Sequence, residues 1–200
     1  MRNYLIVRPK SFLSFQPVSA GSNNDIRIKL KFEERYSVYP GPASILWKYC
    51  DALSDGFWIY RENGLTKVRL SKGGIVKEVE TPSQDLEILI RNRQTLSVNG
   101  AETDISELGN IALSDYAFGI PEAFGYRCNA EVIYYDLRVW AGIIDVEEQL
   151  IFQLDWDGIE YPYDRVTGCE GILKAGNIRP FSKVVRVSKQ TLKKTIVKGG

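Results

Sequence analysis

The feature that most constrains the fold is a run of strict alternation between apolar and charged side chains at residues 25–32. Its apolar members are Ile26, Ile28, Leu30 and Phe32, and its charged members are Asp25, Arg27, Lys29 and Lys31. Period two over eight residues is typical of a β-strand with one face in a core and one in water. The run therefore predicts a half-buried strand.

Segments of the same character recur at short intervals along the chain. Asn63-Gly64 and Gly73-Gly74 separate apolar runs, and such dipeptides favour tight hairpins because both residues tolerate positive φ. A short helix is expected at Thr103–Leu108, and Gln190–Val197 is expected to be a short helix or an arm. The expected strands are Tyr4–Val7, Phe12–Phe15, Asp25–Phe32, Ile45–Cys50, Phe57–Tyr60, Lys67–Leu70, Ile75–Val79, 86–90, 96–98, Glu131–Trp140, Leu150–Leu154 and Ile178–Val187.

The number and spacing of these segments predict an all-β sandwich with about a dozen strands and little helix. Two hundred residues suit one domain, which we take as 1–200. Within it, we expect the sandwich core at about 20–182 and a basic C-terminal strand or arm at 183–200.

Composition excludes several kinds of chemistry. The chain has no histidine, which removes Ser-His-Asp and Cys-His nucleophiles and histidine-ligated zinc, iron or copper. Its three cysteines, Cys50, Cys128 and Cys169, show no C-x-x-C spacing. They are interpreted as free thiols in a reducing compartment, with one Cys50–Cys128 or Cys128–Cys169 bridge left open.

Charge and hydropathy argue against two classes of partner. The net charge of +1 provides no global field to attract nucleic acid or an anionic membrane. Only four apolar residues, Tyr4–Val7, follow Met1-Arg2-Asn3, and no stretch approaches the roughly 18 apolar residues of a membrane span. We expect no nucleic-acid partner, no membrane insertion and no signal peptide.

Two blocks of like charge stand near the C-terminus. Seven acids and no base lie between Asp145 and Asp164, and six bases and no acid lie between Lys183 and Lys198. One interpretation is a pair of solvated faces, or blocks that approach each other. The other is a basic tail that docks on a neighbouring subunit through Lys189, Lys193 and Lys194.

Several segments follow one another in a recognisable order and spacing. They are Asp25–Phe32, Gly56–Tyr60 with Val68–Leu70, Leu96–Gly100, Ile133–Trp140, Tyr163–Gly168 and Gly171–Leu173. Their order resembles the laminin-G-like branch of the concanavalin A-like lectin/glucanase superfamily. The last two resemble the "D-x-x-x-G … G-x-L" closure of versions found on phage virions and Bacteroidetes surface proteins. The resemblance implies a two-sheet antiparallel jelly roll that serves in sugar binding, glycoside hydrolysis, or adhesion and assembly in a larger particle.

Glycoside hydrolysis would need two suitably spaced carboxylates. The superfamily's glucanases carry Glu-x-Asp-x-x-Glu or Glu-x-Asp-x-Glu on one strand. Here the first spacing occurs once, at Glu102–Glu107, and it overlaps the short helix expected at Thr103–Leu108 instead of lying on an expected strand. Asp145–Glu148 has the wrong spacing, and Glu78 and Glu80 share a face but lack the middle Asp in the right register. The chain is therefore not expected to be an enzyme.

Exposed aromatic rings next to polar groups are the usual way in which proteins bind sugars. The loop-like acidic segment offers Trp156, Tyr161 and Tyr163 beside Asp155 and Asp157. Trp58, on an expected strand, is a further candidate for carbohydrate binding. No cofactor is expected, although Asp155-Trp156-Asp157-Gly158 with Glu160 leaves calcium open.

These observations combine into a prediction of a non-enzymatic structural or adhesive module of a phage particle, in a tail fibre, a baseplate or a head decoration. Its expected partners are other virion subunits or copies of itself, with cell-surface glycan left open. Its expected location is the virion, after synthesis in the host cytoplasm. The alternative is a carbohydrate-binding, lectin-like module, and the third candidate is a glycoside hydrolase.

Overall fold

The computed structural model contains fifteen β-strands and one short 3-10 helix in the part of the chain that it describes. The described residues are 2–7, 11–14, 25–37, 41–49, 56–91, 94–109, 130–155, 163–168, 172–175 and 183–187.

Nine strands form the large sheet, in the order β10-β9-β8-β3-β11-β1-β15, with β12 beside β11 and β13 beside β12. The long strand β11 pairs with β3 along one edge, and its other edge is shared by β1 and β12. The strands are β1 (Arg2–Val7), β3 (Asp25–Ser37), β8 (Asp85–Arg91), β9 (Thr95–Val98), β10 (Ala101–Asp104), β11 (Ala130–Ile143), β12 (Glu147–Asp155), β13 (Tyr163–Asp164) and β15 (Lys183–Val187).

Four strands form the small sheet, in the order β4-β5-β6-β7. The predicted hairpin turn between β5 and β6 is confirmed, because Asn63 and Gly64 have φ of 52° and 80°. The strands are β4 (Ala43–Tyr49), β5 (Gly56–Glu62), β6 (Leu65–Lys72) and β7 (Ile75–Thr81), and a separate pair consists of β2 (Ser11–Ser14) and β14 (Ile172–Ala175).

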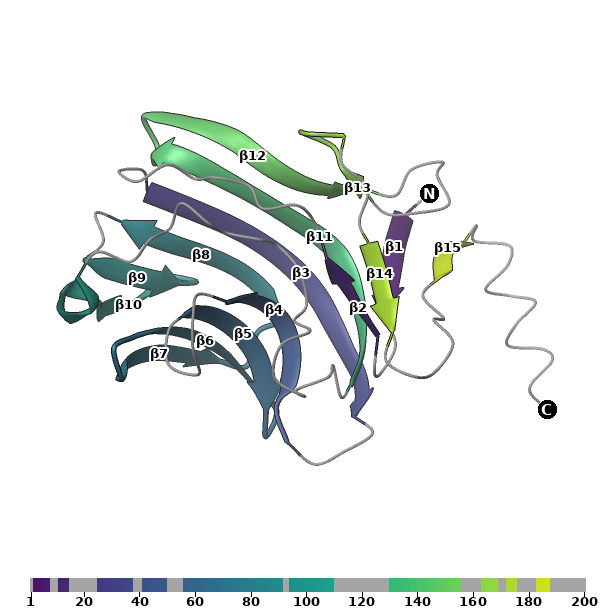
Figure 1. Cartoon of the computed structure of the whole chain (residues 1–200), viewed down its shortest axis with the longest axis horizontal. Coiled ribbons are helices and arrows are strands. Elements are labelled where there is room, and N and C mark those ends of the chain that lie inside the picture. The colour runs from purple at the N-terminus through teal and green to yellow at the C-terminus, as the bar shows by residue number, and fades with distance from the viewer. Residues whose placement is uncertain are drawn as a thin grey trace.

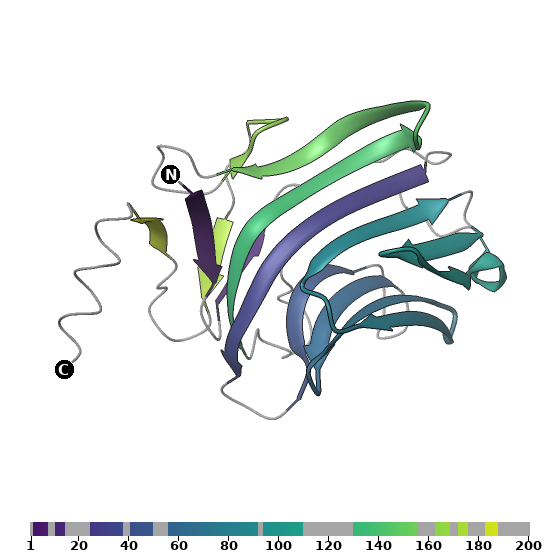
Figure 2. The same cartoon turned by 180° about the vertical axis from the view of Figure 1, so that it is seen from behind.

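The two sheets pack face to face, and both bend in the same sense, so the small sheet lies inside the curve of the large one (Figures 1 and 2). The core fills the space between them. Ile28 on β3 and Ile59 on β5 are fully buried, as are Val68 on β6 and Ile88 on β8. The apolar residues of the alternating run at 25–32 therefore form the core face of β3, as predicted. The face of the small sheet that points away from the core lies on the inner side of the bend (Figure 1).

An ion pair connects the sheets at one end of the sandwich. Arg61 on β5 is 9% exposed, and its Nε donates to Glu34 on β3 at 2.9 Å. Its other nitrogens donate to Thr66 Oγ1 at 2.8 Å and to the carbonyl of Gly64 at 2.6 Å. Each nitrogen of the buried guanidinium donates to an acceptor, which offsets the cost of burying its charge, and the bond to Glu34 connects the hairpin to the large sheet.

In the segment Tyr163–Gly168, which resembles a virion-type closure, Asp164 is buried and organises the turn that follows it. Asp164 is 1% exposed, and its carboxylate accepts hydrogen bonds from the amides of Gln153 at 2.9 Å and Val166 at 3.1 Å. Thr167 adds its hydroxyl at 2.6 Å and its amide at 3.3 Å. The carboxylate thus fixes the turn after β13 to β12.

The all-β, two-sheet antiparallel jelly-roll sandwich with little helix is confirmed. The helix predicted at Thr103–Leu108 is wrong for its first half. Thr103 and Asp104 continue β10 by pairing with β9, and only Ser106–Leu108 form the 3-10 helix η1. Cross-strand pairing outweighs the weak tendency of six residues to form an isolated helix.

Several predictions fall outside the described residues. They concern Cys50, Cys128 and Cys169, the stretch Gln190–Val197, and residues 178–182 of the last expected strand. The single domain at 1–200 with a core at about 20–182 stays a prediction. In the described part of the chain, no helix has the length and apolar character needed to cross a bilayer.

Candidate functional site

The outward side of the small sheet collects aromatic and charged side chains in two cross-strand rows. We call this surface the small-sheet outer face. In the first row Trp58 on β5 pairs with Arg69 on β6, which pairs with Glu78 on β7. In the second row, Tyr60, Lys67 and Glu80 pair in the same way. Because strand side chains alternate, all six point away from the core.

The centre of this face is a stack of two aromatic rings. The Trp58 and Tyr60 ring centroids lie 4.1 Å apart, with 25° between the ring planes. Trp58 is half-buried, whereas Tyr60 is 6% exposed. The register places Trp47 of β4 opposite Trp58. The stack fixes the Trp58 ring in place, so part of a large, rigid aromatic surface faces solvent.

A network of charges surrounds the stack. Lys67 Nζ lies 2.8 Å from Glu80, 3.4 Å from Glu62 and 3.7 Å from Glu78. The hydroxyl of Tyr60 donates to Glu78 at 2.7 Å. The carboxylates are thereby held in place, with acceptor capacity left for further donors.

The same network shifts the pKa of two of its members. Burial, followed by the hydrogen bond to Glu78, raises the pKa of Tyr60 from 10.0 to about 12. The bond to Glu80 is the main cause that raises the pKa of Lys67 above its ordinary value. Tyr60 is therefore a neutral hydrogen-bond donor, and Lys67 a permanent cation, at physiological pH.

Arg69 differs from Lys67 because its guanidinium makes no ion pair with any residue that the structure describes. It lies between Trp58 and Glu78 in the first row. The adjacent row contains the small residues Gly56 and Ser71. The face thus combines an aromatic platform, a donor with five N–H groups and several fixed carboxylate acceptors.

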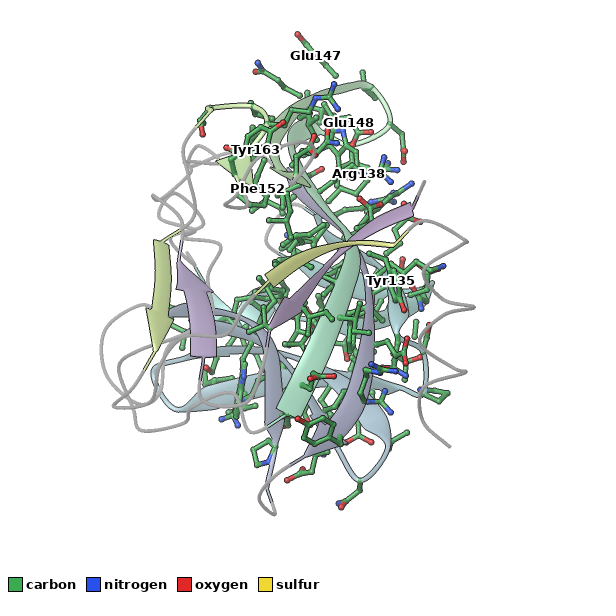
Figure 3. All side chains as sticks on the ribbon, turned by 90° about the vertical axis from the view of Figure 1, so that its right-hand side faces the viewer. Tyr135, Arg138, Glu147, Glu148, Phe152 and Tyr163 are labelled. Atoms are coloured by element: carbon green, nitrogen blue, oxygen red, sulfur yellow. The ribbon has the colours of Figure 1, made fainter. Side chains whose placement is uncertain are left out.

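Of the sequence-predicted glycan residues that the structure describes, Asp155 and Tyr163 lie together and Trp58 lies apart from them. Trp58 lies on the small sheet, whereas Asp155 and Tyr163 are cross-strand partners at the edge of the large sheet, where Tyr163 is labelled in Figure 3. Asp155 accepts a hydrogen bond from Arg165 at 3.3 Å. The remaining candidates, Trp156, Asp157 and Tyr161 for glycan and Lys189, Lys193 and Lys194 for assembly, lie outside the described residues.

A second outward tryptophan, Trp140 on β11, lies on the opposite surface of the sandwich. Lys29 Nζ and the Arg138 guanidinium lie over its ring, at 6.0 Å and 5.5 Å from the centroid. Arg138, which is labelled in Figure 3, also pairs with Asp136. Both positions are within the range of a cation–π contact with Trp140.

Sequence reasoning found Trp58 but missed most of its surroundings. The period of two that places Trp58 outward also places Tyr60 outward, and the Asn63-Gly64 turn fixes which residues of β6 lie opposite. This signal was sufficient to find Lys67 and Arg69. It was not sufficient to find the ion pairs, because these depend on side-chain conformations.

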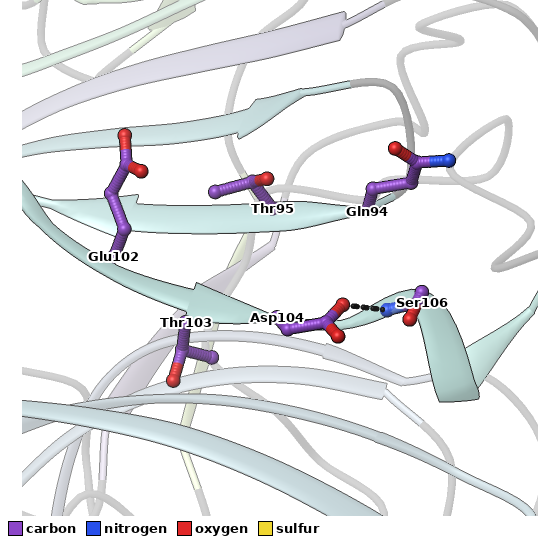
Figure 4. A pocket seen from close by; sticks show the side chains of 6 residues that line it. All are labelled: Gln94, Thr95, Glu102, Thr103, Asp104 and Ser106. Carbon is purple, nitrogen blue, oxygen red and sulfur yellow. Dashed lines mark hydrogen bonds between the residues drawn. The ribbon is translucent and has the colours of Figure 1, made fainter.

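A shallow, polar hollow lies at the edge formed by β9 and β10 (Figure 4). Its volume is about 520 Å³, and Asp104 in it accepts a hydrogen bond from the amide of Ser106 at 2.8 Å. That bond lowers the pKa of Asp104, which makes it a poor general acid. Glu102 and Asp104 of the Glu102–Glu107 spacing both lie on β10, whereas Glu107 lies on η1 and pairs with Lys77 at 2.9 Å, so the three acids do not share one strand. The lining residues are Gln94, Thr95, Glu102, Thr103, Asp104 and Ser106, none of which is aromatic.

Metal binding has little support in the described part of the chain. No group of three or more Cys, Asp or Glu side chains there is arranged to hold an ion. Asp157 and Glu160, which belong to the possible calcium site suggested by the sequence, lie outside that part. Calcium binding therefore stays a possibility raised by the sequence alone.

Comparison with known proteins gives similarity of fold alone. No protein-family model matches the chain, and no curated protein matches its sequence. Among solved structures, a native heptameric SAP-like pentraxin from Limulus polyphemus is 13% identical, with a TM-score of 0.45 over 70% of this chain and 76% of that one. The binding domain of Paraclostridial Mosquitocidal Protein 1 is also 13% identical, with a TM-score of 0.46 over 70% of this chain and 41% of that one.

Proposed function

We propose that the protein is a non-enzymatic, carbohydrate-binding adhesive module that contacts glycan through the small-sheet outer face. The observation that carries this proposal is the Trp58–Tyr60 stack at 4.1 Å, set among fixed charges. A pyranose ring presents C–H groups that pack on an aromatic surface, and its hydroxyls need donors and acceptors at the rim of that surface. Arg69 supplies donors, and Glu78 and Glu80 supply acceptors.

The same arrangement argues against hydrolysis at this face. Glycosidases need one carboxyl group that delivers a proton and one that attacks or activates water. Glu78 accepts the hydroxyl of Tyr60, and Glu80 is paired with Lys67. Two carboxylates engaged in this way hold ligands better than they transfer protons.

The binding test is calorimetry and tryptophan fluorescence with oligosaccharides that contain glucose, galactose, mannose or N-acetylglucosamine. The wild type should bind at least one of them with a change in fluorescence. Trp58→Ala should remove binding, because it removes the aromatic platform. Trp140→Ala is the matched control, since it removes an outward tryptophan of the large sheet, and it should bind as the wild type does.

Two results would overturn the proposal. One is that no oligosaccharide binds the wild type. The other is that Trp58→Ala, with a wild-type circular dichroism spectrum, binds as tightly as Trp140→Ala. Release of reducing ends from a bound oligosaccharide would instead return the glycoside hydrolase to consideration.

A position on a phage particle is the finer part of the proposal, and it rests on the resemblance of Tyr163–Gly168 to virion-borne closures. An adhesive module on a tail fibre, baseplate or head decoration would combine glycan contact with assembly. Quantitative peptide mass spectrometry of purified particles tests this. Stoichiometric peptides support the virion placement, and their absence from particles removes it without affecting glycan binding.

A further inference from the structure

The turn between β11 and β12 exposes two large aliphatic side chains. We call residues 143–147 the hairpin tip. Ile143 is 60% exposed and Val146 is 80% exposed, whereas Ile144 between them is 7% exposed. The amide of Val146 donates to the carbonyl of Ile143 at 3.0 Å, and Asp145 has a left-handed φ of 67°. The tip is therefore a defined tight turn with an apolar surface.

Two arginines from neighbouring strands hold this turn. One carboxylate oxygen of Asp145 accepts a hydrogen bond from Arg27 on β3, and the other accepts one from Arg91 on β8 at 3.0 Å. The side chain of Arg27 is only 14% exposed. A turn fixed in this way loses little conformational entropy when a partner covers it, which favours binding.

The strands around the tip carry acids and no bases of their own, since no Lys or Arg occurs between Val139 and Asp164. Asp145 is paired with Arg27 and Arg91, and Glu148 lies 3.1 Å from Arg27 Nε, so the remaining negative charge of the tip is that of Glu147. Glu147 is exposed and makes no ion pair with a described residue, and it projects from the body of the molecule (Figure 3). A partner for this surface would combine aliphatic side chains with positive charge.

The C-terminal segment of this same chain has that composition. Lys189, Lys193, Lys194 and Lys198 are interspersed with Leu192, Ile196 and Val197, and the segment has no acid. It follows β15, which pairs with β1, and β1 pairs with residues 132–134 of β11. The tip lies at the other end of β11, roughly 30 Å along the strand at about 3.3 Å per residue.

We propose that residues 189–198 of one copy bind the hairpin tip of a second copy, so that the chain associates head to tail. Aliphatic contacts would involve Ile143 and Val146, and Glu147 would meet the lysines. Because the two surfaces differ, the contact is heterologous and repeats from copy to copy until a ring closes or a fibre grows. Such assembly would multiply weak glycan contacts without being required for any one of them.

The experiment is sedimentation velocity of the full chain at low and high ionic strength. The wild type should exceed the 22.7 kDa of one chain at low ionic strength and dissociate as salt screens the charges. I143S/V146S should weaken self-association by about tenfold or more. V76S is the matched control, because Val76 is a 44% exposed aliphatic residue on the small sheet, and it should associate as the wild type does.

A mixing experiment separates contact between copies from contact within one copy. E147K and K189E/K193E/K194E should each be monomeric. The first makes the tip positive against a positive segment, and the second makes the segment negative against a negative tip. Their mixture should associate again, because the unchanged segment of E147K fits the unchanged tip of the other variant and the reversed tip fits the reversed segment. A monomeric wild type, I143S/V146S that associates like the wild type, or a mixture that stays monomeric would each overturn the proposal.

Discussion

Replacing the carboxylate of Asp164 with a methyl group is expected to lower the free energy of unfolding by about 3 kcal/mol. The carboxylate is buried and accepts four hydrogen bonds. The two shortest, from Gln153 at 2.9 Å and the Thr167 hydroxyl at 2.6 Å, contribute about 1.5 kcal/mol each for a charged acceptor. In Asp164→Ala, water can rehydrate the other two donors, which belong to a turn at the surface.

Asp164→Asn separates the charge from the shape of the group. Its side-chain oxygen can still accept from Gln153 and Val166, and its NH2 group can donate to the Thr167 hydroxyl, while the Thr167 amide loses its acceptor. The loss should therefore be about 1–2 kcal/mol, from the change to a neutral acceptor and the loss of the longest of the four bonds. Glu102→Gln, an exposed carboxylate on β10, is the control and should change stability by less than about 0.5 kcal/mol.

The assay is equilibrium unfolding in urea followed by tryptophan fluorescence, with thermal unfolding as a second measure. A loss of about 3 kcal/mol corresponds to a fall in Tm of about 6–12 °C for a chain of this length. The reasoning is refuted if Asp164→Ala loses less than about 1 kcal/mol. It is also refuted if Asp164→Asn is as damaging as Asp164→Ala, because the hydrogen-bonding geometry would then not matter.

Three further changes test other parts of the structure. Arg61→Ala should lower the free energy of unfolding in urea by about 3 kcal/mol, because it leaves the partly buried Glu34 without its cation. A loss below about 1 kcal/mol would show that the ion pair does not hold the two sheets together. The pKa of Tyr60 in the folded protein is raised from 10.0 to about 12. Its contribution to stability is therefore fully present below pH 10 and is lost as the pH rises through 12. The alkaline ultraviolet difference spectrum between wild type and Tyr60→Phe should show this late titration, and a midpoint near pH 10 would contradict it. Gly142→Ala should disrupt the β11–β12 hairpin, because a Cβ at this position would lie 2.1 Å from a backbone oxygen of β12. A Cβ at Gly100 would have nothing within 4 Å, so the control Gly100→Ala should cost only about 1–2 kcal/mol of backbone strain. Equal losses of stability in thermal unfolding would argue against the close approach at Gly142.

The strands were predictable where one face is buried. Ile26, Ile28 and Leu30 alternate with charges, and each is at most 1% exposed. Such a pattern fits only one register against the core. The turn at Asn63-Gly64 was predictable for a related reason, since few residues other than Asn and Gly adopt positive φ cheaply.

The prediction failed where local preference and pairing compete. Thr103 and Asp104 carry no strong preference, and their pairing with β9 decides their structure. Arg61 could not be recognised as a buried cation either, because Glu34 lies on another strand and only the packed sandwich brings the two together. Of the candidate site, Trp58 was predictable from period two, while its stacking on Tyr60 required the side-chain geometry.

The pairing of β11 with three strands, β1, β3 and β12, affects how the chain can fold during its synthesis. β1 and β3 are made first, yet both pair with β11, which ends at Ile143. On the ribosome, the edges of these early strands that pair with β11 keep unpaired N–H and C=O groups until most of the chain has emerged. Pairing at such long sequence separation is slow, and open strand edges recruit other chains in the meantime. Slower translation between Ser37 and Ala130 should therefore lower the soluble yield, whereas slower translation after Ile143 should not.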